Sequence, residues 1–319
     1  MLAVVSAGEG RVEVRDRPDP VPAVSEVVVR VKAAGLNGAD LLQAQGLYPA
    51  PPGSPADILG LELAGEVDAV GPGATRFAVG DKVMGVVGGG AQAERCAVHE
   101  RCLAAVPTGL AWTEAGGFPE AFTTAHDALF SQCGLAMGEH VLVHGAAGGV
   151  GTAAVQLAAL AGARVTATVR NPDLRGDVVR LGGPRGWVKA VDPDDFEDGG
   201  PYDVILELVG AGNLAGNLRA LATGGRISII GVSGAGSRAD IDLRALMAKR
   251  GRIHGSTLRS RSLEEKAEAC RRIERHVLPA LAVGEVRVPV AAAFHLEEAA
   301  AAYARFADGA KLGKIVLEI

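Results

Sequence analysis

The stretch His140-Val-Leu-Val-His-Gly-Ala-Ala-Gly-Gly-Val-Gly151 joins a short apolar run to a glycine-rich turn. The apolar run indicates a buried strand. Ala146, Gly148 and Gly151 then have the spacing of a dinucleotide-binding fingerprint, with alanine in the first glycine position. An apolar helical pattern follows, about one residue per turn: Val150, Ala154, Leu157 and Leu160. The order of strand, turn and helix is the one that the fingerprint requires.

This turn predicts a site for the pyrophosphate of a dinucleotide. A glycine turn lets the backbone approach the pyrophosphate, and the helix N-terminus offers free N–H groups and the positive end of its dipole. We therefore expect Gly149 and Val150 to bind cofactor together with the three fingerprint residues. The alternative is a buried glycine turn that binds nothing.

Length and composition narrow the class of protein. The chain has 319 residues, which suits two domains, and 48% of them are hydrophobic. A net charge of −5 without a basic stripe argues against nucleic acid as a partner. Four scattered cysteines without a Cys-x-x-Cys pair favour a reducing compartment. The N-terminus indicates a first strand, not a signal peptide, and the uncharged segment 141–161 fits a strand, turn and helix. We expect a cytoplasmic protein without a membrane partner.

The chain changes character near residue 120. Before it, strands and turns dominate, with expected strands at Glu26–Lys32, Gly65–Gly71 and Asp81–Val87. After it, strand and helix patterns alternate, which predicts parallel strands with crossover helices. The strands expected there are Val141–His144, Arg164–Val169, Trp187–Val191, Asp203–Leu208, Arg226–Gly231 and Arg252–Gly255. A charged helix at 262–278 is followed by a strand at 286–290, a helix at 296–307 and a strand at 314–319.

Seven segments together resemble the zinc-free quinone oxidoreductases of the medium-chain dehydrogenase/reductase superfamily, most of all the zeta-crystallin-like, tumour-suppressor-inducible branch. These segments are Ala33–Gln43, Gly46–Gly53, Leu59–Gly65, Phe118–Ala125, Gly145–Gly151, Gly255–Arg261 and Gly313–Glu318. The resemblance implies an α/β protein with a GroES-like β-rich catalytic domain and a Rossmann domain with a doubly wound parallel sheet. It implies a catalytic domain at 1–117, completed by 259–319, and an NADPH-binding Rossmann domain at 118–258.

The resemblance also implies an NADPH-dependent quinone oxidoreductase. It places Asn37 and Tyr48 beside the nicotinamide and the quinone, where both would orient a carbonyl oxygen and Tyr48 or water would deliver a proton. Two simpler interpretations compete with this one. Asn37 could only stabilise a turn, and Tyr48 could be a loop aromatic packed on Pro49 and Pro51.

Further site residues follow from the same resemblance. Thr124 matches a threonine near the nicotinamide carboxamide, or serves only as an N-cap or helix hydroxyl of a pattern that runs to Leu129. We expect His126 on the surface of that helix. Glu62 stands in Gly-Leu-Glu where zinc enzymes have Gly-His-Glu, which favours a structural partner over a metal ligand. The remaining expected cofactor residues are Gly210, Gly231, Val232, Ser256 and Thr257.

The second Rossmann strand predicts NADPH over NADH. Folds specific for NAD place an acidic residue about 20 positions after the fingerprint. Here the strand ends at Arg170, whose planar cation can pair with a 2′-phosphate and stack on adenine, and Arg175 could help. The alternative is a solvated arginine at a strand end.

Zinc is not expected, because Asn37 and Leu61 stand where a catalytic site needs cysteine and histidine. A structural zinc lobe would need four close cysteines, and only Cys96 and Cys102 lie in that region. The last Rossmann strand, Arg252–Gly255, is expected at a sheet edge, where pairing with a second copy would make a homodimer.

The reaction expected first is direct hydride transfer from NADPH to a quinone. A second interpretation keeps the fold and reduces an enone or enoyl thioester instead. A zinc-free alcohol dehydrogenase fits less well, because no Lewis acid or acid relay is visible in the sequence. The non-enzyme alternative is an NADPH-binding structural or regulatory protein.

Overall fold

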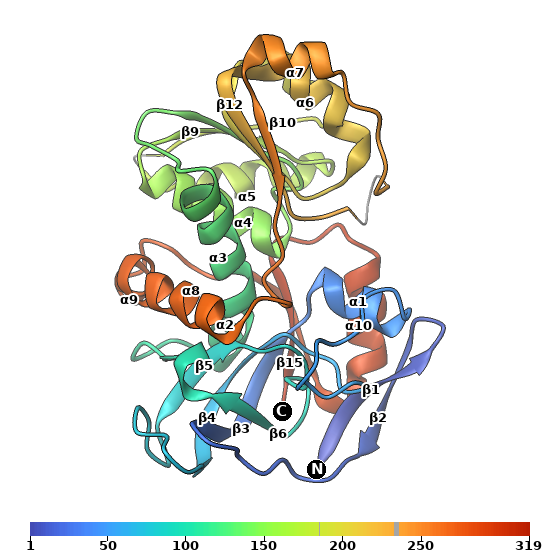
Figure 1. The fold of residues 1–319 in the computed structure, drawn as a ribbon, viewed down its shortest axis with the longest axis vertical. Coiled ribbons are helices and arrows are strands. Elements are labelled where there is room, and N and C mark those ends of the chain that lie inside the picture. Colours follow the sequence, from blue (N-terminus) through green and yellow to red (C-terminus); the bar gives the residue numbers. More distant parts are fainter. Residues whose placement is uncertain (185, 233–235) are drawn as a thin grey trace. The chain divides into compact units, whose positions relative to one another are not determined.

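The computed structural model describes residues 1–184, 186–232 and 236–319, and the chain divides into two compact units (Figure 1). Unit 1 comprises residues 1–123, 258–310 and 314–319. Unit 2 comprises residues 124–257 and 311–313. Both chain ends belong to unit 1, and most of unit 2 lies between them in the sequence.

Unit 1 is built on a seven-stranded sheet with the order β14-β15-β3-β4-β5-β7, and β6 pairs with β3 off this path. The strands are β3 (Glu26–Gly35), β4 (Glu62–Val70), β5 (Lys82–Val86), β6 (Arg95–His99), β7 (Leu103–Ala105), β14 (Val290–His295) and β15 (Lys314–Glu318). The C-terminal strand β15 runs antiparallel to β3, with Val316 opposite Gly35 (Figure 1). Residues from the two chain ends therefore meet in one sheet.

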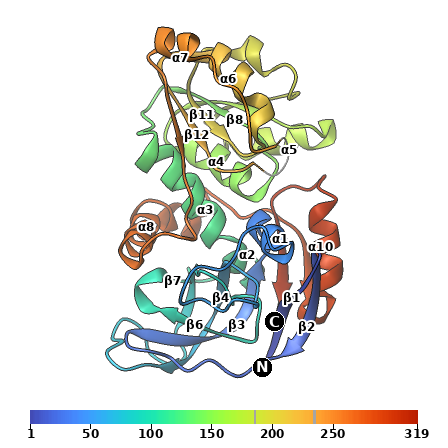
Figure 2. The ribbon, with the colours of Figure 1, turned by 45° about the vertical axis from the view of Figure 1, so that its right-hand side comes forward.

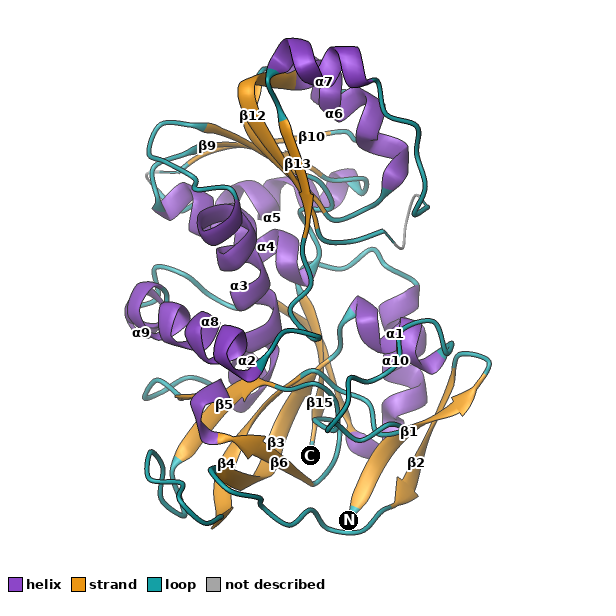
Figure 3. Cartoon of the chain, in the orientation of Figure 1, coloured by secondary structure: helices purple, strands orange, loops and turns teal. Residues whose placement is uncertain are grey.

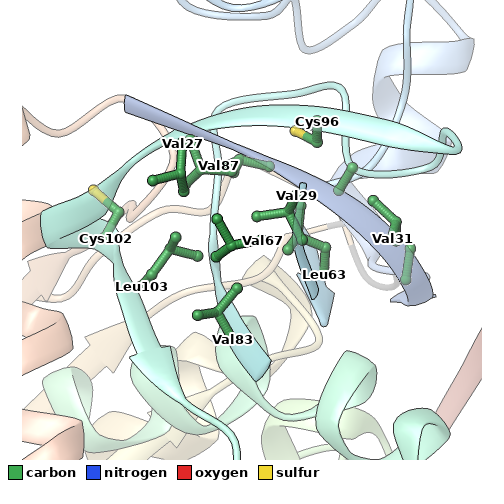
Figure 4. Close-up of a cluster of buried hydrophobic side chains, with 13 residues drawn as sticks. Val27, Val29, Val31, Leu63, Val67, Val83, Val87, Cys96, Cys102 and Leu103 are labelled. Atoms are coloured by element: carbon green, nitrogen blue, oxygen red, sulfur yellow. The ribbon is translucent and has the colours of Figure 1, made fainter. Parts of the chain in front are cut away.

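Apolar side chains of this sheet form a core of their own. Val29 from β3, Leu63 from β4 and Val83 from β5 point toward one another and are fully buried (Figure 4). Cys96 and Cys102 belong to the same cluster. Their place among valines and leucines indicates a packing role.

A hairpin and several helices complete unit 1 (Figure 3). They are β1 (Leu2–Gly8), β2 (Arg11–Asp16), α1 (Gly38–Ala44), η1 (Glu100–Cys102), α2 (Trp112–Gly117), α8 (Leu263–His276), α9 (Leu278–Ala282), η6 (Leu296–Glu298) and α10 (Ala299–Ala307). The Ser262 side chain caps α8 by accepting the N–H of Glu265. Ile273 lies on the buried, apolar face of the helix. The charged helix expected at 262–278 is thus confirmed, with its last residue in α9.

Strands dominate the first 115 residues as expected, and α1, η1 and the start of α2 are the short helices among them. One expectation for unit 1 was wrong. The strand expected at 286–290 begins only at Val290. Pro289 precedes it, and proline has no N–H to donate to a strand ladder.

Unit 2 contains six parallel strands in the order β10-β9-β8-β11-β12-β13. They are β8 (His140–Val143), β9 (Arg164–Thr168), β10 (Trp187–Val191), β11 (Tyr202–Glu207), β12 (Leu221–Ile229) and β13 (Arg252–Gly255). Counted along the chain, this order is 3-2-1-4-5-6, that of a doubly wound dinucleotide-binding sheet. The fold class expected from the sequence is confirmed, and β13 lies at the sheet edge as expected.

Helices cover both faces of this sheet (Figure 2). They are α4 (Gly149–Leu160) and α5 (Arg175–Arg180) on one face, and α6 (Leu214–Ala220) and α7 (Leu243–Lys249) on the other. The short helices are η3 (Pro172–Leu174), η4 (Phe196–Gly199) and η5 (Ala211–Asn213). The helices change faces between β8 and β11, and ligands of such sheets bind beyond the strand ends at that point.

Helix α3 (Pro119–His126) and the π-helical turn η2 (Asp127–Gln132) precede the sheet. Thr124 lies inside α3, so it is not the N-cap of a helix. His126 is 5% exposed, and its ring centroid lies 5.0 Å from that of Phe130. The expectation that His126 lies on the helix surface was wrong, because its side chain is buried and packs against Phe130. Within the described residues, each helix is too short or too polar to cross a membrane.

Candidate active site

The glycine turn of unit 2 begins where β8 ends and leads into α4. Gly145 has a φ of +63°, which glycine adopts without strain. A Cβ on Gly151 would lie 2.4 Å from the Gly145 carbonyl oxygen and 2.7 Å from the Ala146 Cα, so only glycine fits there. Ala146 is buried and donates its N–H to the Thr168 carbonyl at 3.1 Å. Gly145, one position before the fingerprint, makes the sharp turn, which explains why alanine is tolerated at 146.

The N-terminus of α4 has the features of an anion site. Gly148 is its N-cap, and the first turn carries no acidic side chain. Gly149 and Val150 follow and are partly exposed, and the first N–H groups of a helix have no partner within it. Gly313 donates its N–H to the Ala147 carbonyl at 2.8 Å and so fixes the turn. These residues fit the pyrophosphate of a dinucleotide.

Arg170 follows β9 after one buried residue, and its side chain is exposed. The preceding Val169 donates its N–H to the Val191 carbonyl at 2.9 Å, which fixes the strand end. Arg175 is held elsewhere, because it donates to the Val169 carbonyl and, at 2.5 Å, to the Asp192 carboxylate. Of the two arginines expected near the adenosine end of a cofactor, Arg170 is therefore the accessible one.

Glu207, at the end of β11, organises the neighbouring turn, and the sequence analysis did not identify it. Its Oε1 accepts the N–H groups of Val209 and Gly210 at 2.7 and 2.9 Å. Its Oε2 accepts the Asn217 side-chain N–H at 2.9 Å, and the Asn217 Oδ1 lies 2.8 Å from the His144 Nε2. Burial lowers the pKa of His144, against the charge of Glu207, so the imidazole is neutral at pH 7. The carboxylate thereby fixes the backbone of Gly210, an expected cofactor residue.

The other expected cofactor residues of unit 2 lie beyond the ends of β12 and β13. A Cβ on Gly231 would lie 2.5 Å from the Leu208 carbonyl oxygen, so glycine is required by close packing. Val232 is exposed, as is Thr257, while Ser256 donates its N–H to the last carbonyl of β12 at 3.1 Å. They occupy the strand ends at which a doubly wound sheet binds ligands.

In unit 1, Asn37 stands at the start of α1 with its side-chain amide held by charged groups. Its backbone N–H donates to the Asp40 carboxylate at 2.8 Å. Its Nδ2 donates to the Glu62 Oε1 at 2.9 Å and, more weakly, to the Gly35 carbonyl at 3.4 Å. Its Oδ1 accepts from the Lys314 Nζ at 2.7 Å. Lys314 is the one side-chain donor to this Oδ1 among the described residues, so its second lone pair can accept a further hydrogen bond.

Glu62 and Lys314 form a buried ion pair, with 2.6 Å between the Oε1 and the Nζ and side-chain exposures of 0% and 3%. The ammonium also donates to the Leu36 carbonyl at 2.8 Å. A Cβ on Gly35 would lie 2.4 Å from the Glu62 Oε1, so glycine makes room for this carboxylate. The other oxygen of Glu62 accepts the N–H of Glu120 at 2.8 Å. These contacts with Lys314, Asn37 and Glu120 support the structural role expected for Glu62.

Asp40 is fully buried beside this pair. Its oxygens accept the N–H of Gly60 at 3.2 Å and the side-chain N–H of Gln92 at 3.4 Å, besides that of Asn37. The Tyr303 hydroxyl donates to the other end of Gln92 at 2.9 Å. Burial raises the pKa of Asp40 to about 7, although its N–H donors and nearby cations oppose the shift.

Tyr48 is held by Arg259, which the sequence analysis did not single out. The guanidinium carbon lies 5.2 Å from the ring centroid, and the Nη1 donates to the Tyr48 carbonyl at 3.0 Å. The Nε of Arg259 donates to the Gly88 carbonyl at 2.7 Å, so the arginine joins two loops. Burial raises the pKa of Tyr48, against the charge of Arg259. Both expected catalytic residues are held by polar side chains of unit 1: Asn37 by Asp40, Glu62 and Lys314, and Tyr48 by Arg259.

No group of three or more metal-ligating side chains is found among the residues that the structure describes. Leu61 is buried and apolar, and Asn37 is engaged with Glu62 and Lys314. Cys96 lies in the apolar core, where burial raises its pKa to about 12.

Two family descriptions match the chain. The alcohol dehydrogenase GroES-like domain matches residues 23–133, and the zinc-binding dehydrogenase family matches residues 188–317.

Curated relatives fall into two groups. A phenolphthiocerol/phthiocerol polyketide synthase of Mycobacterium tuberculosis is 34% identical over 303 residues, and erythronolide synthase EryA2 of Saccharopolyspora erythraea is 37% identical over 313 residues. These matches cover 93% and 94% of this chain but only 14% and 8% of those proteins. The quinone oxidoreductase of Lama guanicoe is 30% identical over 308 residues, 93% of this chain and 90% of that protein.

Solved structures show the same division. A quinone oxidoreductase of Pseudomonas syringae has a TM-score of 0.88 at 28% identity, over 100% of this chain and 99% of that chain. The CurK enoyl reductase has a TM-score of 0.84 at 25% identity, over 99% and 98%. Mycobacterial Rv1454c, solved with NADPH, has a TM-score of 0.86 at 26% identity, over 100% of each chain.

Proposed function

The chain belongs to the medium-chain dehydrogenase/reductase superfamily, and on that premise we propose that it is an NADPH-dependent quinone reductase. The observation that carries the proposal is the match to a quinone oxidoreductase over 90% of that enzyme's length. The relatives of higher identity match only a small part of much longer synthases. A quinone is a strong electrophile, so its reduction places modest demands on acid catalysis.

Unit 2 would hold the cofactor. The turn at Gly148, Gly149, Val150 and Gly151 would take the pyrophosphate, and Arg170 would pair with the 2′-phosphate that distinguishes NADPH. Rv1454c, which shares the fold, was solved with NADPH, and this supports the choice. Thr124 in α3 and the strand-end residues Gly210, Gly231, Val232, Ser256 and Thr257 would surround the remainder of the cofactor. When bound, NADPH supplies the hydride.

Unit 1 would hold the acceptor. The free lone pair of the Asn37 amide and the Tyr48 hydroxyl are polar groups on neighbouring segments, before and after α1. Tyr48 would donate a hydrogen bond to the acceptor's carbonyl oxygen and later its proton. The Glu62–Lys314 pair would keep the Asn37 amide in one orientation, since its oxygen and nitrogen are fixed by opposite charges.

An enoyl-thioester reductase is the second candidate. Polyketide synthases match nearly the whole chain at 34% and 37% identity, and the CurK enoyl reductase shares the fold. The hydride would then reach a carbon atom, and an enolate oxygen would take the place of the quinone oxygen beside Tyr48. Binding of NADPH without any turnover would leave the structural or regulatory alternative.

The zinc-free mechanism, the cytoplasmic location and the homodimer belong to the same proposal. Asn37 and Leu61 support zinc independence, because neither is a usual zinc ligand. The edge position of β13 supports a dimer, because an exposed edge can pair with its copy about a two-fold axis. Light scattering at micromolar concentration and metal analysis after dialysis test these two points.

The deciding experiment measures oxidation of NADPH by the pure protein with quinones, enones and enoyl thioesters in parallel. Stopped-flow with NADPH deuterated at C4 should give a primary isotope effect from one face of the nicotinamide. Faster turnover of quinones supports the first proposal. Much faster turnover of enones or enoyl thioesters replaces it with the second, and no turnover with any acceptor removes both.

A further inference from the structure

Glu120 is a third carboxyl group beside Glu62 and Asp40 in unit 1; the residue is partly exposed, but its Oε2 atom is buried. It lies in the first turn of α3, where its backbone N–H donates to the Glu62 carboxylate at 2.8 Å. Its own Oε2 is buried and has no hydrogen-bond partner among the described residues. An ionised oxygen in such a position would lack the donors that normally compensate burial.

The surroundings of Glu120 favour its neutral form. Burial and the charges of Glu62 and Asp40 raise the pKa of Glu120 to about 8, while Lys314 and Arg259 oppose the shift. These groups face it from β4, α1, β15 and the segment after β13. At neutral pH Glu120 therefore carries an acidic proton, which makes it a hydrogen-bond donor.

The other polar groups of this network are already occupied. The Lys314 ammonium has three acceptors, in Leu36, Asn37 and Glu62. Asp40 accepts three N–H donors, as described above. Tyr48 and Glu120 differ from these groups, because neither the phenol hydroxyl nor the Oε2 is engaged by a neighbouring side chain in the described network. The negative charge of Glu120 also raises the pKa of Tyr48, so the two acids influence each other.

We propose that Glu120 stores the proton that the reduction consumes and passes it to Tyr48 through an intervening water, since no hydrogen bond joins the two side chains among the described residues. This inference rests on the proposed reductase function. The acceptor gains a hydride, which carries two electrons, and NADPH is thereby oxidised to NADP⁺. The anionic oxygen of the reduced acceptor takes the phenol proton of Tyr48. The phenolate takes the carboxyl proton of Glu120, and the resulting carboxylate takes a proton from water.

The proposal fixes the sign of the pH dependence. Glu120 can donate only while it is protonated, so kcat should fall as pH rises through its pKa of about 8. Glu120→Gln keeps the size of the side chain but has no carboxyl proton. This variant should lose that fall and turn over roughly 100-fold more slowly below pH 8. Glu120→Asp keeps a carboxyl group, so its kcat should still fall as pH rises.

The test measures pH profiles of kcat for the wild type, Glu120→Gln, Glu120→Asp and Tyr48→Phe, with the best acceptor of the screen. Glu297→Gln, which changes an exposed glutamate of η6, is the matched control. If Glu120 acts through Tyr48, the double variant should be no slower than the worse single variant. Infrared spectra of wild type and Glu120→Gln give a readout without turnover, namely the C=O band of a protonated carboxylic acid lost in the variant.

Failure of the relay and failure of the reductase function look different. A wild type that oxidises NADPH, with Glu120→Gln showing the same pH profile and kcat, overturns the relay alone. An infrared spectrum without a protonated carboxyl band above pH 6 also overturns the relay alone. A wild type that oxidises NADPH with none of the acceptors overturns the reductase function, whatever the infrared spectrum shows.

Discussion

Unit 1 buries an ion pair, Glu62 with Lys314, whereas unit 2 buries the carboxylate of Glu207 among backbone and amide N–H donors. In unit 2 the nearest basic group is His144, which is neutral at pH 7. The first arrangement balances charge with charge, and the second spreads one charge over several dipoles.

The difference suits what each unit would do. Glu207 fixes the backbone of a turn, and N–H dipoles are enough for that task. In unit 1, burial raises the pKa of Asp40 to about 7 and that of Glu120 to about 8. Groups that can change protonation near pH 7 are what a proton-consuming reaction needs.

The largest expected effect comes from breaking the ion pair of unit 1. Lys314→Met removes the only cation bonded to Glu62 among the described residues, and leaves a buried carboxylate without its counterion. We expect a loss of about 3–5 kcal/mol in the free energy of unfolding, measured by urea titration. The double variant with Glu62→Gln should recover part of this loss. If the single variant is as stable as the wild type, charge balance does not hold this network together.

Replacing Glu207, the buried carboxylate of unit 2 described above, should lower the free energy of unfolding by less. Glu207→Gln replaces one acceptor oxygen with an NH₂ group that faces N–H donors of Val209, Gly210 or Asn217. We expect a loss of about 1–3 kcal/mol, because one buried hydrogen bond is replaced by a donor–donor contact. The same urea titration compares it directly with Lys314→Met. A larger loss than for Lys314→Met would reverse the contrast between the units.

The units also differed in how far the sequence predicted them. The turn of unit 2 is continuous in the sequence, so strand, fingerprint and helix could be recognised together, and five of six strands were placed within about two residues at each end. The start of β12 was missed by five residues, since Gly224 and Gly225 interrupt its apolar pattern. Periodicity is local, and it predicts local structure well.

The site of unit 1 is assembled from distant segments. Asn37 and Lys314 are 277 residues apart, and Arg259 and Tyr48 are 211 apart. Asn37 and Tyr48 were chosen only through the family resemblance, and the sequence offered no signal for Arg259 or Glu120 as their neighbours. The contact of Asn37 with Lys314 depends on the pairing of β15 with β3, which no short pattern encodes.

Two glycine variants test whether the turn of unit 2 binds a ligand or is only a tight turn. Gly151→Ala should weaken both folding and NADPH binding, because its Cβ would lie 2.4 Å from a backbone oxygen; the expected loss of stability is about 1–3 kcal/mol. Gly148→Ala is the matched variant, since its nearest neighbour would be 3.4 Å away. It should fold normally but bind NADPH more weakly, because the pyrophosphate needs close backbone approach. Calorimetry of both variants with NADPH decides between the interpretations; unchanged binding by Gly148→Ala would favour the turn that binds nothing.

The smallest expected effect separates two arginines that look equivalent in the sequence. Arg170 is exposed at the end of β9, whereas Arg175 is held by Asp192 and the Val169 carbonyl. Arg170→Ala should therefore lower the preference for NADPH over NADH about fivefold, since an exposed ion pair with a phosphate contributes on the order of 1 kcal/mol. Arg175→Ala should leave the preference unchanged and lower stability slightly, because it removes a strand-end contact instead of a cofactor contact. Dissociation constants of both nucleotides, measured at one salt concentration, distinguish these outcomes. An unchanged preference in Arg170→Ala would show that another part of unit 2 recognises the 2′-phosphate.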